Sequence, residues 1–273
     1  MKYSVLMTVY SGDSPLFFQQ SLMSMVNQSF KPDEIVLVKD GPIPKSIQLI
    51  INEVNKLTTG LIKEIQLEKN VGLGLALNEG LKACNNELIA RMDSDDISLP
   101  KRCERQIIEF EKNPSLDIVG CPVYEFIDST ENVVGIRRVP LTMNLIKKYV
   151  RRRDPFNHPT VIYRKSKLLE IGGYKDLRKN QDTDLWLRMI NNGCIGMNIP
   201  EVLFFFRFNN NTYKKRKSWI NTKLLISIRY EAYKLKYCSL LDFCIVAFSQ
   251  VGIFILPTKI QKIIYMKFLR NKK

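Results

Sequence analysis

The chain has 273 residues, which is enough for one large folded core or for a core with an added segment. Hydrophobic residues make up 45% of it and charged residues 25%, and this balance excludes a disordered or fibrous protein. The net charge of +15 is uneven, with −3 in residues 1–100, +6 in residues 101–200 and +12 in residues 201–273. The basic character therefore belongs to the last quarter of the chain.

Cysteine and histidine usage indicates the compartment. The six cysteines form no C-x-x-C pair and there is one histidine, so neither a zinc site nor a disulfide framework is supported. Reduced thiols in a cytosolic setting fit this pattern best. The opening stretch MKYSVLMTVYSG has a short apolar run broken by a polar turn, which predicts a strand and not a signal peptide.

Apolar runs and helix-like segments alternate through the first hundred residues. The pattern predicts strands at 4–10, 34–38, 62–67 and 87–92, with helices at 15–28, 47–57 and 75–83. Such alternation is typical of a doubly wound α/β sheet with helices on both faces, whose ligands bind beyond the carboxyl ends of the strands. Thr8, Asp40, Asn70 and an acidic cluster all fall at these ends, so we expect them in a ligand site.

The acidic cluster follows an apolar strand in the stretch ELIARMDSDDISLP, residues 87–100. Its carboxylates belong to Asp93, Asp95 and Asp96. Like charges this close repel one another unless a cation lies between them, so a divalent metal ion is expected to bind here. The alternative is an acidic turn before a helix opened by Pro100, with Asp96 or Ser98 as its N-cap.

The second hundred residues are less regular. The pattern predicts a helix at 101–113, two strands at 117–128 and 133–139, a strand at 160–164 and a short helix from residue 166. Three arginines at 151–153 are typical of a solvated surface, although beside a metal–diphosphate site they could bind anions. His158 precedes a proline at a strand start, which favours a hydrogen-bonded structural role over catalysis.

A predicted helix at 180–192 has an apolar face and carries Asp182 at its N-terminus. An aspartate at this position commonly serves as the N-cap. It could equally act as a general base that takes a proton from an incoming hydroxyl group. The position of the residue does not separate these two roles.

The order and spacing of these stretches resemble glycosyltransferase family 2 over about residues 3–208. The matching segments are SVLMTVYSGD, VKDG, NVGLGLALNEGL, MDSDDISLP, NHPTVIYRKS, GGY and QDTDLWLRM. The resemblance implies a GT-A fold, with a nucleotide-sugar-binding half at 1–100 and an acceptor-binding half at 101–209. It also implies inverting transfer of one sugar from a nucleotide-sugar donor, with UDP as the usual carrier.

The resemblance also implies roles for single residues. Thr8 and Asp40 would contact the nucleoside, and Asp93 and Asp95 would form the D-x-D motif. Asp95 would bind Mn²⁺ or Mg²⁺, and Asp182 would be the base.

The chain departs from the family pattern at two places. It reads Lys39-Asp40-Gly41-Pro42 where the family usually has D-D-G-S, and Gln181-Asp182 where the family has E-D. Both matched aspartates are retained, so activity is expected. The base lacks its acidic neighbour in sequence, and Asp184 is an alternative base.

Residues 210–273 are a different kind of sequence, with a basic run at 214–217 and a mostly apolar run at 240–256. The apolar run has 17 residues, short of the roughly 20 that span a bilayer. We expect this region to be helical and to lie peripherally on the anionic cytoplasmic face of the inner membrane, where the acceptor would be a lipid-linked saccharide or oligosaccharide. The alternative is a helical hairpin that covers the catalytic domain.

Other classes of function share some of these features. A sugar nucleotidyltransferase shares the need for a metal and carboxylates. A non-catalytic protein that binds nucleic acid or membranes would account for the net charge, but the sequence has no nucleic-acid-binding motif, so no nucleic-acid partner is expected.

Overall fold

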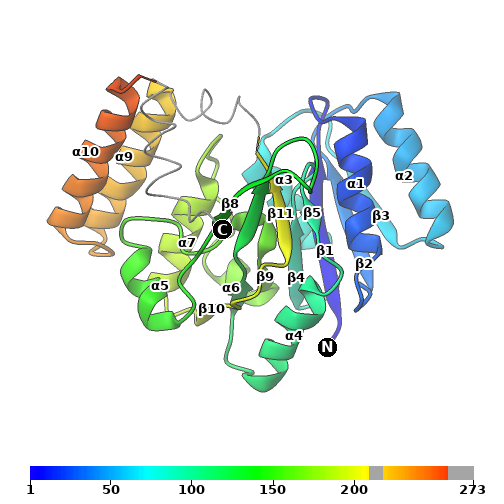
Figure 1. The fold of residues 1–273 in the computed structure, drawn as a ribbon, viewed down its shortest axis with the longest axis horizontal. Coiled ribbons are helices and arrows are strands. Elements are labelled where there is room, and N and C mark those ends of the chain that lie inside the picture. Colours follow the sequence, from blue (N-terminus) through cyan, green and yellow to red (C-terminus); the bar gives the residue numbers. More distant parts are fainter. Residues whose placement is uncertain (209–217, 258–273) are drawn as a thin grey trace.

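The computed structural model describes residues 1–208 and 218–257, and its centre is a seven-stranded sheet in the order β10-β6-β9-β4-β1-β2-β3 (Figure 1). The strands are β1 (Tyr3–Val9), β2 (Glu34–Lys39), β3 (Ile62–Gln66), β4 (Leu88–Met92), β6 (Ile118–Gly120), β9 (Ile162–Arg164) and β10 (Gly196–Asn198). Strands β1 to β4 are parallel, and β9 runs antiparallel to both β4 and β6. The mixed α/β sheet expected from the sequence is confirmed.

Helices cover both faces of this sheet. The side chains of β1 alternate between two buried clusters, so that Val5 and Met7 pack on one side and Leu6 on the other. The first side is covered by α1 (Pro15–Val26), α2 (Lys45–Leu57) and α4 (Arg102–Lys112). The second is covered by α3 (Leu73–Ala83), α5 (Met143–Tyr149), α6 (Lys165–Glu170) and α7 (Gln181–Asn191).

A second sheet of four strands follows the order β5-β11-β7-β8. Its strands are β5 (Ile97–Ser98), β11 (Phe204–Arg207), β7 (Val123–Phe126) and β8 (Val133–Arg137). The sequence predicted one strand at 117–128, and this prediction is wrong. Pro122 lies between β6 and β7 and has no backbone N–H to donate, so the segment divides between the two sheets.

Three further details differ from the sequence-based expectation. The segment His158–Thr160 forms a 3₁₀ turn, η1, before β9 begins. Lys101 is the N-cap of α4, so neither Asp96 nor Ser98 caps that helix. The sequence did not predict α5, β5, β10 or β11.

The C-terminal helices α9 (Trp219–Lys234) and α10 (Leu240–Ile255) form a hairpin beside α5 and α7 at the edge of the molecule (Figure 1). The side chains of Ile228 and Ala232 on α9 join the buried cluster of the main domain. No helix within residues 1–208 and 218–257 combines the length and apolar character needed to cross a bilayer. The basic run expected at 214–217 lies outside the described residues.

Candidate active site

The candidate site lies where the chain order of the main sheet reverses. Strands β2 and β3 lie on one side of β1, and β4 lies on the other. A crevice forms at such a reversal, beyond the carboxyl ends of the strands. Thr8 is the second-last residue of β1, Asp40 directly follows β2 and Asp93 directly follows β4. The sheet therefore brings together the strand ends that the sequence predicted as a ligand site.

Asp40 shapes one corner of this crevice. Its carboxylate accepts hydrogen bonds from the backbone N–H groups of Val71 at 2.7 Å and Gly72 at 3.1 Å. Gly41 has φ +86°, and a Cβ there would lie 2.7 Å from the backbone nitrogen of Asn70, so the two loops can approach only with glycine. Asn70 in turn donates from Nδ2 to the Asp40 carbonyl at 3.3 Å. The contact of Thr8 and Asp40 with a nucleoside stays a prediction.

The acidic loop after β4 holds its three carboxylates in different environments. Asp93 pairs with Arg91, whose side chain is buried within β4. Asp95 is exposed, and desolvation by the surrounding loop, with the charges of Asp93 and Asp13, raises its pKa to about 6. Asp96 is fully buried, and burial raises its pKa well above the usual range. Asp95 is thus the member of the loop that faces solvent.

Arg207 of β11 fixes the acidic loop, a role that sequence reasoning missed. Its backbone N–H donates to Asp96 Oδ1 at 2.7 Å, and its Nε donates to the Asp95 carbonyl at 2.7 Å. Nη2 donates to Gln20 Oε1 at 2.7 Å, and the guanidinium lies 3.8 Å from the centre of the Phe17 ring. The signal in the sequence was an arginine that ends the apolar run FFFR.

The residues present fit a metal that is shared with a ligand. Within the described chain, no group of three or more histidine, cysteine or acidic side chains could hold a metal ion. Mg²⁺ is commonly held by one or two carboxylates together with substrate phosphates. Asp95 can supply such a carboxylate, with Asp93 beside it, whereas Asp96 is engaged with Arg207. The loop therefore suits a cation completed by a nucleotide diphosphate, not a self-contained protein site.

Asp182 lies at the second position of α7. The N-cap is Asn180, in the left-handed conformation with φ 56°, so the N-cap role considered for Asp182 is wrong. Asp182 is half-buried and accepts a hydrogen bond on Oδ1 from the Thr183 N–H at 3.0 Å. Burial and the negative charge of Asp154 raise the pKa of Asp182 to about 7. Asp154 therefore supplies in space the acidic neighbour that is missing from position 181.

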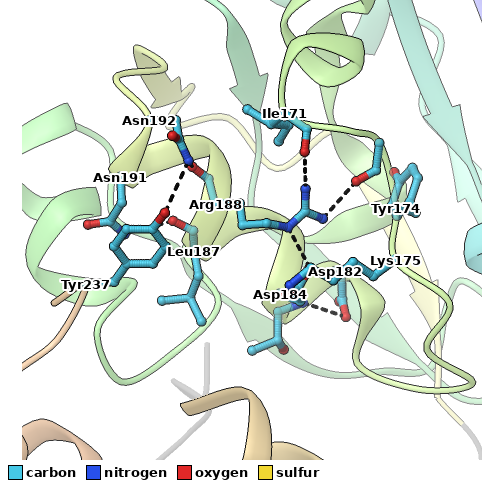
Figure 2. A network of polar contacts seen from close by, with 12 residues as sticks. Ile171, Tyr174, Lys175, Asp182, Asp184, Leu187, Arg188, Asn191, Asn192 and Tyr237 are labelled. Atoms are coloured by element: carbon cyan, nitrogen blue, oxygen red, sulfur yellow. Dashed lines mark hydrogen bonds and ion pairs between the residues drawn. The ribbon is translucent and has the colours of Figure 1, made fainter. Parts of the chain in front are cut away.

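Asp184 is bound into a structural network (Figure 2). Its carboxylate lies 3.0 Å from Lys175 Nζ and 2.7 Å from Arg188 Nε. Arg188 also donates to the carbonyls of Ile171 and Gly173, each at 2.7 Å. Asp184 thus serves as a counter-ion, and Asp182 is the acidic side chain of α7 that no ion pair engages among residues 1–208 and 218–257.

His158 and Tyr174 are buried side chains that contact each other. His158 is buried and shares a 2.8 Å hydrogen bond between Nε2 and the Tyr174 hydroxyl. Burial and the nearby charge of Arg91 lower the pKa of His158, which keeps the ring neutral and favours the structural role expected from the sequence. Burial raises the pKa of Tyr174, and the charges of Asp182 and Asp93 add to this shift. Tyr174 is therefore within electrostatic reach of both carboxylates.

The charge of Arg137 on β8 lowers the pKa of Asp182 and so opposes the effect of Asp154. In the triple arginine, Arg152 Nε pairs with Asp242 Oδ1 of α10 at 2.5 Å. Arg151 and Arg153 are exposed.

Comparison with known proteins gives close relatives over the full length. The family model described as glycosyl transferase family 2 matches residues 4–172. An Escherichia coli UDP-Gal:alpha-D-GlcNAc-diphosphoundecaprenol beta-1,3-galactosyltransferase is 37% identical over 99% of this chain and 97% of its own. The amylovoran biosynthesis glycosyltransferase AmsE of Erwinia amylovora is 34% identical over 97% of this chain and 98% of its own.

Solved structures agree on the fold. The mannosyltransferase PcManGT from Pyrobaculum calidifontis, in complex with GDP-Man and Mn²⁺, has a TM-score of 0.64 at 14% identity and covers 96% of this chain and 78% of its own. TarS of S. aureus has a TM-score of 0.59 at 18% identity over 85% of this chain, which spans 44% of TarS. With the family match and the full-length relatives, these results show that the chain belongs to glycosyltransferase family 2.

Proposed function

We propose that this protein transfers one sugar, with inversion, from a UDP-sugar to a hydroxyl group of a lipid-linked saccharide diphosphate. The observation that carries the proposal is the presence of two acidic centres, the loop of Asp93 and Asp95 that follows β4 and Asp182 at the start of α7, with the charges of Asp93 and Asp182 both acting on Tyr174. The galactosyltransferase of E. coli, similar over the whole chain, is named for UDP-Gal and a GlcNAc-diphosphoundecaprenol acceptor.

Asp95, with Asp93 beside it, is proposed to hold Mn²⁺ or Mg²⁺ together with the donor diphosphate. Such an ion stabilises negative charge on phosphate oxygens as a Lewis acid. Arg207 keeps the loop in place, because it binds both the Asp95 carbonyl and the Asp96 carboxylate. The solved complex of PcManGT with GDP-Man and Mn²⁺ supports a metal in a protein of this fold.

Asp182 is proposed to remove the proton from the acceptor hydroxyl. Its pKa of about 7 leaves a large fraction of the carboxylate charged at neutral pH and makes it a stronger base than an ordinary aspartate. Attack on the anomeric carbon from the side opposite the leaving diphosphate inverts the configuration in a single displacement.

The C-terminal hairpin is proposed to place the enzyme peripherally on the cytoplasmic face of the inner membrane. The helix α10 exposes Leu241, Ile245 and Phe248. The exposed Arg151 and Arg153 flank Arg152, which pairs with α10, and a combination of basic and exposed apolar groups is typical of membrane-binding surfaces. All six cysteines are free thiols, which fits a reducing compartment.

The proposal is tested with a panel of nucleotide sugars and two acceptors, a GlcNAc-diphosphate lipid and free GlcNAc, each with Mn²⁺, Mg²⁺ or EDTA. We expect UDP to be released with the lipid acceptor and a divalent ion. Release of pyrophosphate would indicate nucleotidyl transfer instead. Transfer to free GlcNAc but not to the lipid acceptor would reject the proposed acceptor class.

A further inference from the structure

The helix that carries Asp182 is held at both ends by the C-terminal hairpin. At its start, Nδ2 of the N-cap Asn180 donates to Asn221 Oδ1 of α9 at 2.9 Å. At its end, Asn192 Nδ2 donates to the hydroxyl of Tyr237, which follows α9, at 3.4 Å (Figure 2). The hairpin therefore contacts α7 at both ends, although the two elements are separated in sequence.

A second contact from α9 reaches the loop before η1. The side chain of Arg229 is buried, with Nη2 3.9 Å from Asp154 Oδ1 and Nη1 donating to the Val150 carbonyl at 2.5 Å. Burying a guanidinium costs free energy unless it is paired, and apolar contacts such as that of Ile228 would dock the helix without this cost. The choice of arginine at 229 thus calls for an explanation beyond packing.

Asp154 is the anion that Arg229 holds, and its charge acts on Asp182. The groups that bear on Asp182 are Asp154 from this loop, Arg137 from β8, Tyr174, and the backbone N–H of Thr183. Only Asp154 among them adds a negative charge at neutral pH. The contacts of α9 thus reach both the N-cap side chain at the start of α7 and the acidic neighbour of Asp182.

We propose that α9 is a working part of the active site, in which Asn221 and Arg229 are positioning residues that hold Asp182 through Asn180 and Asp154. The proposal rests on the role of Asp182 as the base. It assigns a catalytic purpose to a helix that lies outside the matched family region, residues 4–172.

The first test measures the protonation of Asp182 directly, without substrate, by ¹³C NMR of the full chain labelled at the aspartate carboxyl carbons. The signal is assigned by its loss in Asp182→Asn. In Asp154→Asn the negative charge is gone, so we expect the pKa of Asp182 to fall by about one unit. In Arg229→Met the charge of Asp154 loses its counter-ion, so we expect the pKa to rise. The double variant should behave as Asp154→Asn does.

The second test addresses position. In Asn221→Ala we expect kcat to fall about tenfold or more, with the KM for donor unchanged, because a small displacement of the base slows chemistry and leaves donor binding intact. Asn221→Asp keeps an acceptor oxygen for Asn180 and should restore most of the rate. A role in stability alone would change the melting temperature and leave kcat as it is.

Arg164→Met is the matched control, since Arg164, like Arg229, donates to backbone carbonyls, in its case those of Leu116 and Pro114 on another part of the domain. It should change neither the pKa of Asp182 nor kcat. The proposal is overturned if Asp154→Asn leaves that pKa at the wild-type value, or if Asn221→Ala keeps full kcat. If Arg229→Met does not fold, the pKa of Asp182 measured in Asp154→Asn still tests the proposal. A wild type that transfers no sugar would count against the proposed function alone, because the NMR measurement needs no substrate.

Discussion

Asp182 combines two properties that oppose each other. Burial and the charge of Asp154 raise its pKa to about 7, which suits a base at neutral pH. The same shift means that the folded protein prefers the protonated acid, so ionising Asp182 costs stability. Asp184, two residues further along α7, is paired with Lys175 and Arg188 and has the opposite character. One helix turn thus carries one aspartate whose negative charge is disfavoured by its surroundings and another whose charge is paired.

Replacement of Asp182 by asparagine tests the base. Removing a general base typically slows a reaction by about 10²–10⁴-fold, and we expect a loss of that size in kcat with donor binding retained. Donor affinity is measured by calorimetry with UDP and Mn²⁺. As a contrast, Asp184→Asn should lower the melting temperature while the folded enzyme keeps its activity. A fully active Asp182→Asn enzyme would rule out this residue as the base.

The pH dependence follows from the same shift. The base must be deprotonated, so kcat should rise with pH through an acid limb near pH 7. The stability of the folded protein changes with pH in the opposite direction to kcat. The contribution of the protonated acid is full below the unfolded pKa near 4 and is lost as the pH rises through about 7. Asp182→Asn should therefore melt higher than wild type at pH 8, by about 3 °C, and the difference should vanish below pH 4.

At the scale of elements, the acidic loop is enclosed by strands that come from far apart in the sequence. The loop runs from β4 into β5, and β11 pairs with β5 and brings Arg207 beneath the loop. The loop is thereby tied to α1 through Gln20. A fixed loop can bind a cation and a diphosphate without first paying the entropy of ordering.

Replacement of Arg207 tests this role of β11. In Arg207→Met the Asp95 carbonyl and Gln20 lose their donor, so we expect binding of UDP with Mn²⁺ to weaken about tenfold, with a smaller loss in Arg207→Lys. Calorimetry measures the affinity without any acceptor. Arg105→Met removes a surface arginine that pairs with Glu201 and should leave the affinity unchanged. Equal affinities in Arg207→Met and wild type would show that the loop holds its shape without this residue.

The exposed face of α10 is tested by its binding to vesicles that contain anionic lipid. Phe248 is 76% exposed, so Phe248→Ser removes little packing and should leave the melting temperature unchanged while weakening cosedimentation with vesicles. Leu57 on α2 is also 76% exposed, and Leu57→Ser is the matched control. Vesicle binding that Phe248→Ser does not reduce would remove α10 from the proposed membrane surface.

The first half of the fold could be predicted because β1, β2 and β4 are mostly apolar and buried on both faces. The second half resisted because β6, β7 and β10 have only three or four residues each, too few to show a period. Because the ends of β2 and β4 could be predicted, so could the positions of Asp40 and Asp93 at the carboxyl edge of the sheet. Arg207 and Asp154 could not be found, since their roles depend on contacts with residues far away in sequence.

At the scale of the whole molecule, the charge divides along the chain in the same way as the proposed tasks. The acidic excess of residues 1–100 includes the carboxylates at the donor end of the site, and a metal would offset their charge. The basic excess lies in residues 201–273, and most of it falls at 214–217 and 259–273, outside the described residues.

The thickness of the C-terminal hairpin bears on which acceptors can reach Asp182. If α10 lies on lipid as proposed, with α9 between it and α7, the start of α7 would stand two helix widths from the bilayer, about 20 Å. The pair of helices would then act as a spacer that selects acceptors by height. A hydroxyl carried too close to the headgroups, or on a chain that is already long, would pass below or above the carboxylate that must receive its proton.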